Sequence, residues 1–203
     1  MGPIEVLWGI LIVVFMLVGL VRGFLKELGV TTILIVLLFG FDRLIPFLES
    51  FINSGGLASI GVAPLNAPDP AAARSTQTLL WALLSLITVA VVFISYQGET
   101  LTYEGTNPRF PVGALLSVLI GFINGYLIAG TLWWIVNRYG YPVQSLGFRL
   151  PLTELANTIV NNLKLLPPDL LGGGVGSAPE TSIESYGILP LLLVVLIILK
   201  VIR

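Results

Sequence analysis

The sequence predicts an all-α integral membrane protein, built as a bundle of about five transmembrane helices with one or two interfacial amphipathic helices. Of its 203 residues, 56% are hydrophobic and only 10% are charged, whereas a soluble domain carries about 25% charged residues. The mean hydropathy is +0.97. A soluble fold of this size must present a polar surface to water. The composition therefore excludes an ordinary soluble globule and a disordered chain.

Five segments are apolar enough to cross a bilayer, which takes about 20 consecutive apolar residues. All four tryptophans lie near an end of one of these segments, which is typical of the aromatic belts at membrane interfaces. The expected spans are residues 4–21, 28–41, 78–96, 112–136 and 186–202.

The second span is short, and we expect it to continue as an interfacial amphipathic helix over residues 42–52. In that helix the charged Arg43 and Glu49 lie opposite an apolar face. The residues of this face are Leu44, Ile45, Leu48, Phe51 and Ile52.

A second amphipathic helix is expected over residues 151–166, within an extramembrane segment spanning 137–182. Two positions suit it equally: on the membrane or a partner, or over its own bundle. We expect the pair Pro167-Pro168 to end this helix. A glycine-rich linker at 172–176 then leads to a last part, 183–203, so that residues 1–136 form the membrane core. The apolar face of the helix consists of Leu152, Leu155, Ala156, Ile159, Val160, Leu163 and Leu166.

The fourth span carries small residues at every fourth position, which places them along one helix face. Small side chains allow two backbones to approach closely in lipid. We expect this track to pack against a helix of the same chain, with a dimer contact as the alternative. The track consists of Gly113, Ser117, Gly121, Gly125 and Ala129.

Asn124 lies in the middle of the same span. A buried amide in hydrocarbon needs a hydrogen-bond partner. We expect a structural role, with contact to a transported substrate as the alternative. Hydroxyl groups that could serve as its partner are those of Thr31, Thr32, Ser85 and Thr88.

Several functions are disfavoured by what the sequence lacks. It has no Cys and no His, so we expect no metal and no cofactor held by side-chain ligation, while contact with lipid, quinone or pigment stays open. The net charge of -1 argues against nucleic acid as a partner. No charged residue is expected well inside a span, which argues against an ion or proton transporter. No hydrolase or phosphate-loop motif is present, so we expect no enzyme.

The turn between the first two spans, residues 19–27, reads G-x-x-R-G-F-x-K-E. It resembles the signature of the colicin V production protein family, and the similarity extends over residues 4–136. The run from Ser117 to Gly125 adds to it, although Asn124 stands where the family has a basic residue, and only Arg109 remains of the usual Asp-Arg pair. The turn residues that carry the resemblance are Gly19, Arg22, Gly23, Phe24, Lys26 and Glu27.

The resemblance implies a protein integral to a prokaryotic cytoplasmic (inner) membrane, with a role in colicin export, a toxin biosynthetic process, or in envelope physiology. From the residues themselves we expect a non-enzymatic scaffold or accessory subunit. Its partners would be the lipid bilayer and other membrane subunits of a larger complex, for example a photosynthetic, respiratory or secretory one. An export or permeation factor of the family's kind is the alternative.

Overall fold

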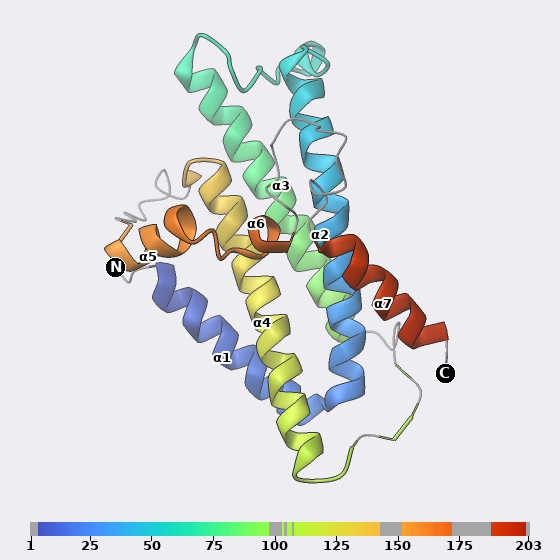
Figure 1. Ribbon diagram of the computed structural model, residues 1–203. Coiled ribbons are helices and arrows are strands. Elements are labelled where there is room, and N and C mark those ends of the chain that lie inside the picture. Colours follow the sequence, from blue (N-terminus) through green and yellow to red (C-terminus); the bar gives the residue numbers. More distant parts are fainter. Residues whose placement is uncertain are drawn as a thin grey trace.

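Four long helices dominate the computed structural model (Figure 1). They are α1 (Ile4–Arg22), α2 (Phe24–Asn53), α3 (Pro70–Gln97) and α4 (Val112–Arg138). All four are long and apolar enough to cross a membrane. The structure describes residues 4–97, 103, 105–106, 108–142, 152–171 and 188–201, without the side chains of 197 and 199–201. Within these residues it contains helices and no strands.

The second helix differs from its prediction. We expected a short span followed by an interfacial helix at 42–52, but α2 is one continuous helix of 30 residues with Pro46 inside it. The predicted apolar face is divided, because Ile45 and Ile52 are fully buried in the core while Leu44 and Phe51 are exposed. This part of α2 therefore packs one side against the bundle and leaves the other side uncovered.

The helix α3 begins with a built N-terminus. The side chain of Asp69 accepts a hydrogen bond of 2.9 Å from the backbone N–H of Ala71, and Pro70 occupies the first helical position. The preceding connection contains the single turn η1 (Ala58–Ile60) and is fixed to α3 by a hydrogen bond of 2.8 Å from the Thr76 hydroxyl to the carbonyl of Ala63.

The predicted helix over 151–166 is broken into pieces. Thr153 caps α5 (Glu154–Asn157), a π-helical turn η3 (Thr158–Asn162) follows, and the chain then bends at Lys164, whose φ is 46°. Pro167, expected to end the helix, instead begins α6 (Pro167–Leu171), because proline fits the first turn of a helix.

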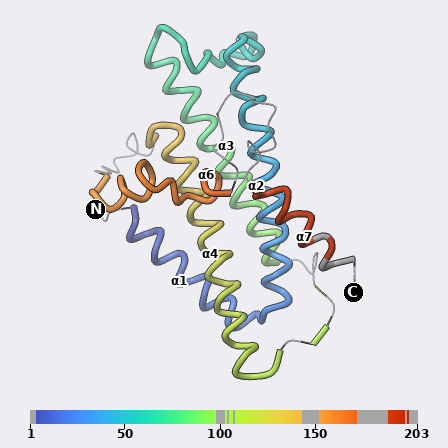
Figure 2. Tube along the Cα trace, viewed as in Figure 1, coloured from blue at the N-terminus to red at the C-terminus, as the bar shows by residue number. Residues whose placement is uncertain are grey.

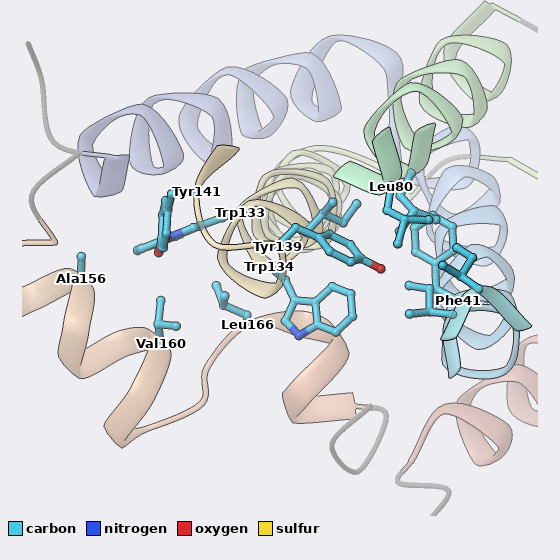
Figure 3. Close-up of a cluster of buried hydrophobic side chains, with 13 residues drawn as sticks. Phe41, Leu80, Trp133, Trp134, Tyr139, Tyr141, Ala156, Val160 and Leu166 are labelled. Atoms are coloured by element: carbon cyan, nitrogen blue, oxygen red, sulfur yellow. Dashed lines mark hydrogen bonds between the residues drawn. The ribbon is translucent and has the colours of Figure 1, made fainter. Parts of the chain in front are cut away.

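These pieces cover the bundle to which they belong. Ala156, Val160 and Leu166 pack into the core cluster beside Trp133 and Tyr141 (Figure 3). Of the two predicted positions for this segment, the one over its own bundle is therefore observed. Leu155 and Leu163, from the same predicted face, are exposed, so only part of that face packs on the bundle.

The last described helix, α7 (Leu189–Val201), has 13 residues, about 20 Å at the usual rise. It lies obliquely beside α2 at the opposite side of the bundle from α1 (Figure 2). Leu189 and Leu196 join a second core cluster with Val30 and Leu34 of α2. The predicted span 186–202 begins and ends outside the described residues. The glycine-rich linker at 172–176 also lies outside them. A fifth crossing therefore stays a prediction.

Candidate functional site: a polar network joining the four long helices

A single glycine separates the first two helices. Gly23 has φ 90° and ψ 157°, a conformation that a residue with a side chain rarely adopts. The N–H of Gly23 donates to the carbonyl of Gly19 (3.0 Å), and the N–H of Glu27 donates to the carbonyl of Gly23 (3.2 Å). The chain thus reverses within one residue and places Arg22 and Glu27 on the same corner.

The small-residue track of α4 packs against α1 of the same chain. A Cβ atom on Gly121 would lie 2.7 Å from the carbonyl oxygen of Phe15, and one on Gly125 would lie 2.9 Å from Cα of Ile12. From the other side, a Cβ on Gly19 would lie 2.6 Å from the carbonyl oxygen of Ser117. The two backbones are therefore in direct contact along this face.

The ends of the track have other neighbours. A Cβ on Gly113 would collide with the carbonyl of Pro108 in the preceding connection. Ala129 is buried, and the next residue, Gly130, which the sequence analysis did not single out, faces the ring of Pro167 in α6. The track therefore packs on different partners along its length.

Glu27 is the centre of a buried polar network. Its side chain is completely covered by protein. Its carboxylate accepts hydrogen bonds from Arg22 Nη1 (3.1 Å), from the Tyr96 hydroxyl (3.0 Å) and from Asn124 Nδ2 (2.8 Å). These donors belong to α1, α3 and α4, so one carboxylate joins all four long helices.

Asn124 is saturated by α2. Its amide N–H₂ group donates to the Glu27 carboxylate and to the Glu27 backbone carbonyl (3.0 Å), while its amide oxygen accepts from Thr31 Oγ1 (2.7 Å). Thr31 is thus its partner among the hydroxyl groups we proposed. Thr32 instead contacts the Tyr103 hydroxyl at 2.9 Å, and Thr88 donates to the carbonyl of Leu84 in its own helix.

Arg22 connects this network to the edge of the bundle. Its side chain is 22% exposed, its guanidinium carbon lies 4.5 Å from the centre of the Tyr96 ring, and Nη2 donates to the carbonyl of Tyr96 (3.2 Å). The other two signature residues differ, because Phe24 is half-buried and Lys26 is exposed, and neither contributes to the network. The corner and the small-residue track, which the sequence suggested separately, meet at Glu27 and Asn124.

The burial of Glu27 was not predicted. The second span was expected to begin at residue 28, but α2 begins at Phe24, so Glu27 stands in the first turn of the helix, where α1, α3 and α4 surround its side chain. Tyr96 was missed as a partner because it ends the predicted span 78–96, 69 positions away from Glu27, and no local pattern relates the two residues. The one usable signal was the proximity of Arg22 and Glu27 on either side of Gly23.

A second polar cluster lies at the other end of α4. Arg138 donates to both carboxylate oxygens of Glu49 (2.9 and 2.7 Å), and the Tyr139 hydroxyl donates to the same group (3.0 Å). Burial, reinforced by the charge of Glu49, raises the pKa of Tyr139, so its phenol stays protonated at neutral pH. Next to it, Trp134 Nε1 donates to the carboxylate of Asp169 in α6 (2.8 Å). These pairs fix α2 and α6 to the end of α4.

Both oxygens of the Glu27 carboxylate, and the amide oxygen and amide nitrogen of Asn124, are bonded to other groups of the protein. In the described part of the chain, no group of three or more acidic residues could hold a metal ion. The oxygens of Glu27 contrast with Glu5 Oε2, Trp8 Nε1 and Trp81 Nε1, which are buried and have no hydrogen-bond partner among the described residues. The network is therefore suited to holding helices together.

The fold and this network define a class: a helical protein with four apolar helices of membrane-spanning length, joined by one polar network. No protein family, curated protein or solved structure matches the chain.

Proposed function

We propose that this protein is an integral scaffold or accessory subunit of a larger complex in a prokaryotic cytoplasmic membrane, with no catalytic reaction of its own. The observation that carries the proposal is the division of its surface. The polar side chains of the Glu27 network are turned inward and bonded to one another, whereas the outward faces of α1 and α3 are apolar and exposed.

The outer face of α1 makes this division plain. The helix contacts α4 along one narrow glycine-lined face. Only 11% of the residues in its most apolar stretch are buried. The opposite face presents apolar side chains at helical spacing, including Val14, which is 46% exposed, and Leu17, which is 55% exposed. The outer face of α3 is similar, with Leu86 and Phe93 exposed. Such faces suit lipid or the helices of neighbouring subunits.

The resemblance to the colicin V production protein family supports a structural role. Four of the signature residues take part in the corner: Gly19 and Gly23 allow the close approach and the reversal, and Arg22 and Glu27 form the ion pair. Membership of that family, with its role in export or envelope physiology, is part of the proposal.

Photo-crosslinking in native membranes tests the proposal. A crosslinking amino acid at Leu17 or Leu86 samples the outer faces, and one at the buried Ile12 of α1 is the matched control. The expected result is a discrete protein adduct from an outer site, none from Ile12, and co-purification of the same partner in mild detergent. Adducts to lipid alone, together with a clean monomer in mild detergent, would contradict the proposal.

An export or permeation factor is the second candidate, and the burial of Glu27 favours it. A fully buried carboxylate in an apolar bundle is costly and often marks a transport pathway. Among the groups that could line a path, however, Ser117 and Thr88 donate to backbone carbonyls of their own helices, and Asn124 is fully paired. The variant Glu27→Gln distinguishes the two candidates. Loss of substrate export from cells, while the fold and the crosslinked partner adducts persist, would support the permeation role. Unchanged substrate export would reject the permeation role.

A further inference from the structure

A polar pocket of about 210 Å³ lies between the first turns of α3 and the turn that follows α4. Its walls include Arg74, Gln77, Tyr139, Gly140 and Tyr141. The volume far exceeds the roughly 10–15 Å³ that a single water needs on the same measure. The pocket is separate from the Glu27 network, and neither the scaffold nor the permeation proposal uses it.

The turn after α4 is built to hold one wall of this pocket. Gly140 has φ 70° and Tyr141 has φ 55°, so two successive residues are left-handed. The N–H of Tyr141 donates to the carbonyl of Val136 (2.9 Å), and that of Gly140 donates to the carbonyl of Asn137 (3.2 Å), which is the Schellman pattern of a helix end. The left-handed backbone conformation is unfavourable for a tyrosine. The packing around Tyr141 must therefore hold it in this conformation.

The aromatic cluster supplies that packing. Trp133 Nε1 donates to the Tyr141 hydroxyl at 3.3 Å, and both residues belong to the buried cluster (Figure 3). Because Tyr141 is buried there, this bond helps to hold the residue in its left-handed conformation.

The charge of the pocket is positive and uncompensated. Arg74 is exposed and makes no ion pair with any described residue. The carboxylate bonded to the pocket residue Tyr139 is that of Glu49, and Arg138 already engages both of its oxygens. The pocket therefore offers the Arg74 guanidinium and the Gln77 amide as donors, and its lining contains no carboxylate among the described residues.

The pocket is surrounded by residue types that are common at the depth of lipid headgroups. It opens beside the end of α4, where Trp133, Trp134, Tyr139 and Tyr141 belong to one cluster (Figure 3). Tryptophan and tyrosine favour the headgroup level of a bilayer, and arginine binds phosphate oxygens in a bidentate manner.

We propose that this pocket binds the phosphate of an anionic phospholipid headgroup, with Arg74 as the main ligand and Gln77 as a further donor. A zwitterionic headgroup fits less well, because its cation finds no unpaired carboxylate there. The proposal requires that the chain lies in a membrane, but it does not depend on the scaffold role.

Ligand-dependent thermal stability of the full chain in neutral detergent tests the proposal. Phosphatidylglycerol, phosphatidylcholine and inorganic phosphate are titrated against the wild type, Arg74→Gln and Arg109→Gln. Arg109 is a matched control, because it is an exposed arginine before the other end of α4. We expect phosphatidylglycerol to raise the unfolding midpoint of the wild type and of Arg109→Gln, and to bind Arg74→Gln at least about tenfold more weakly. Arg74→Lys keeps the positive charge but loses the bidentate guanidinium, so its affinity for phosphatidylglycerol should lie between those of the wild type and Arg74→Gln.

Three results would overturn the proposal. Equal binding of phosphatidylglycerol by Arg74→Gln and the wild type would show that the lipid does not bind at Arg74. Equal binding of phosphatidylcholine would reject the anionic preference, and an Arg74-dependent shift with inorganic phosphate alone would reject the lipid as its source. The midpoint without ligand reports whether Arg74→Gln is folded, and Gln77→Leu, which leaves the charge in place, provides a second variant that should weaken phosphatidylglycerol binding.

Discussion

Asn124, near the middle of α4, donates a hydrogen bond of 2.8 Å to the carboxylate of Glu27 at the start of α2. The two residues are separated by 97 positions in the chain. Their contact joins the Arg-Gly-Phe corner to the small-residue track, so the two features recognised in the sequence form one structural unit. Because both side chains are fully buried, each depends on the other for its hydrogen bonds.

Removing the central carboxylate should destabilise the bundle strongly. Glu27→Leu leaves the donors on Arg22, Tyr96 and Asn124 without their acceptor, and we expect a loss of about 3–5 kcal/mol in the free energy of unfolding. The adjacent Lys26→Leu is the control, because Lys26 is exposed and should change stability by less than about 0.5 kcal/mol. Reversible unfolding in mixed detergent micelles measures both. Equal stabilities for the two variants would show that the network does not hold the helices.

Adding a methyl group to the glycine track should separate α1 from α4. In Gly121→Ala the new Cβ would lie 2.7 Å from the backbone oxygen of Phe15, and we expect a loss of about 1–3 kcal/mol. Gly121→Leu and Gly125→Leu should prevent folding or assembly. Gly40→Ala is the matched control, since nothing lies within 4 Å of its new Cβ and alanine favours the helix by up to about 1 kcal/mol. If Gly121→Ala were as stable as Gly40→Ala, the close contact would be refuted.

The two buried threonines Thr31 and Thr88 should respond differently to valine. Thr31→Val removes the hydroxyl that donates to the Asn124 amide oxygen (2.7 Å), and we expect a cost of about 1–2 kcal/mol. Thr88 donates only to Leu84 of its own helix, so Thr88→Val should be nearly neutral. Thermal unfolding followed by tryptophan fluorescence compares them, and a larger loss for Thr88→Val would contradict this account of the network.

The attachment of α6 should depend on pH through Asp169. Burial raises the pKa of Asp169 above its ordinary 3.8, although Trp134 and Lys164 act in the opposite direction. The folded state therefore binds the proton more tightly than the unfolded state, and this contribution to stability is lost as the pH rises from 3.8 through the folded pKa. Asp169→Asn keeps an acceptor for Trp134 Nε1 and removes the titration.

The measurement is the difference between wild type and Asp169→Asn in unfolding midpoint across this pH range. We expect the midpoint of the wild type to fall relative to that of the variant as the pH rises. A difference that stays constant, or that has the opposite sign, would show that Asp169 is not held in a setting that disfavours its charge.

Features of the fold that depend on residues close together in the sequence could be predicted, and features that depend on contacts between distant segments could not. Spans one, three and four were recognised from local hydropathy, and the small-residue track on α4 from its spacing of four. Thr31 was named as a partner of Asn124 because buried amides need one. These inferences require only a local pattern or a simple rule about unsatisfied groups.

Interactions between distant segments could not be predicted in this way. The continuity of α2 depends on Ile45 and Ile52 packing into the core, and the breaks after Asn157 and Leu163 depend on how the segment fits over Trp133. Tyr96 reaches Glu27 from a position 69 residues away. Periodicity describes one helix at a time, so the contacts that turned Glu27 from a helix end into a buried centre left no pattern in the sequence.

A double-mutant cycle between Glu27 and Asn124 tests most directly whether the corner and the small-residue track act as one unit. The free energies of unfolding are compared for the wild type, Glu27→Leu, Asn124→Leu and the double variant. The account predicts a coupling energy of at least about 1 kcal/mol, because the second substitution removes a partner that the first has already orphaned. Additivity within about 0.3–0.5 kcal/mol would show that the two sites are independent and would contradict the account.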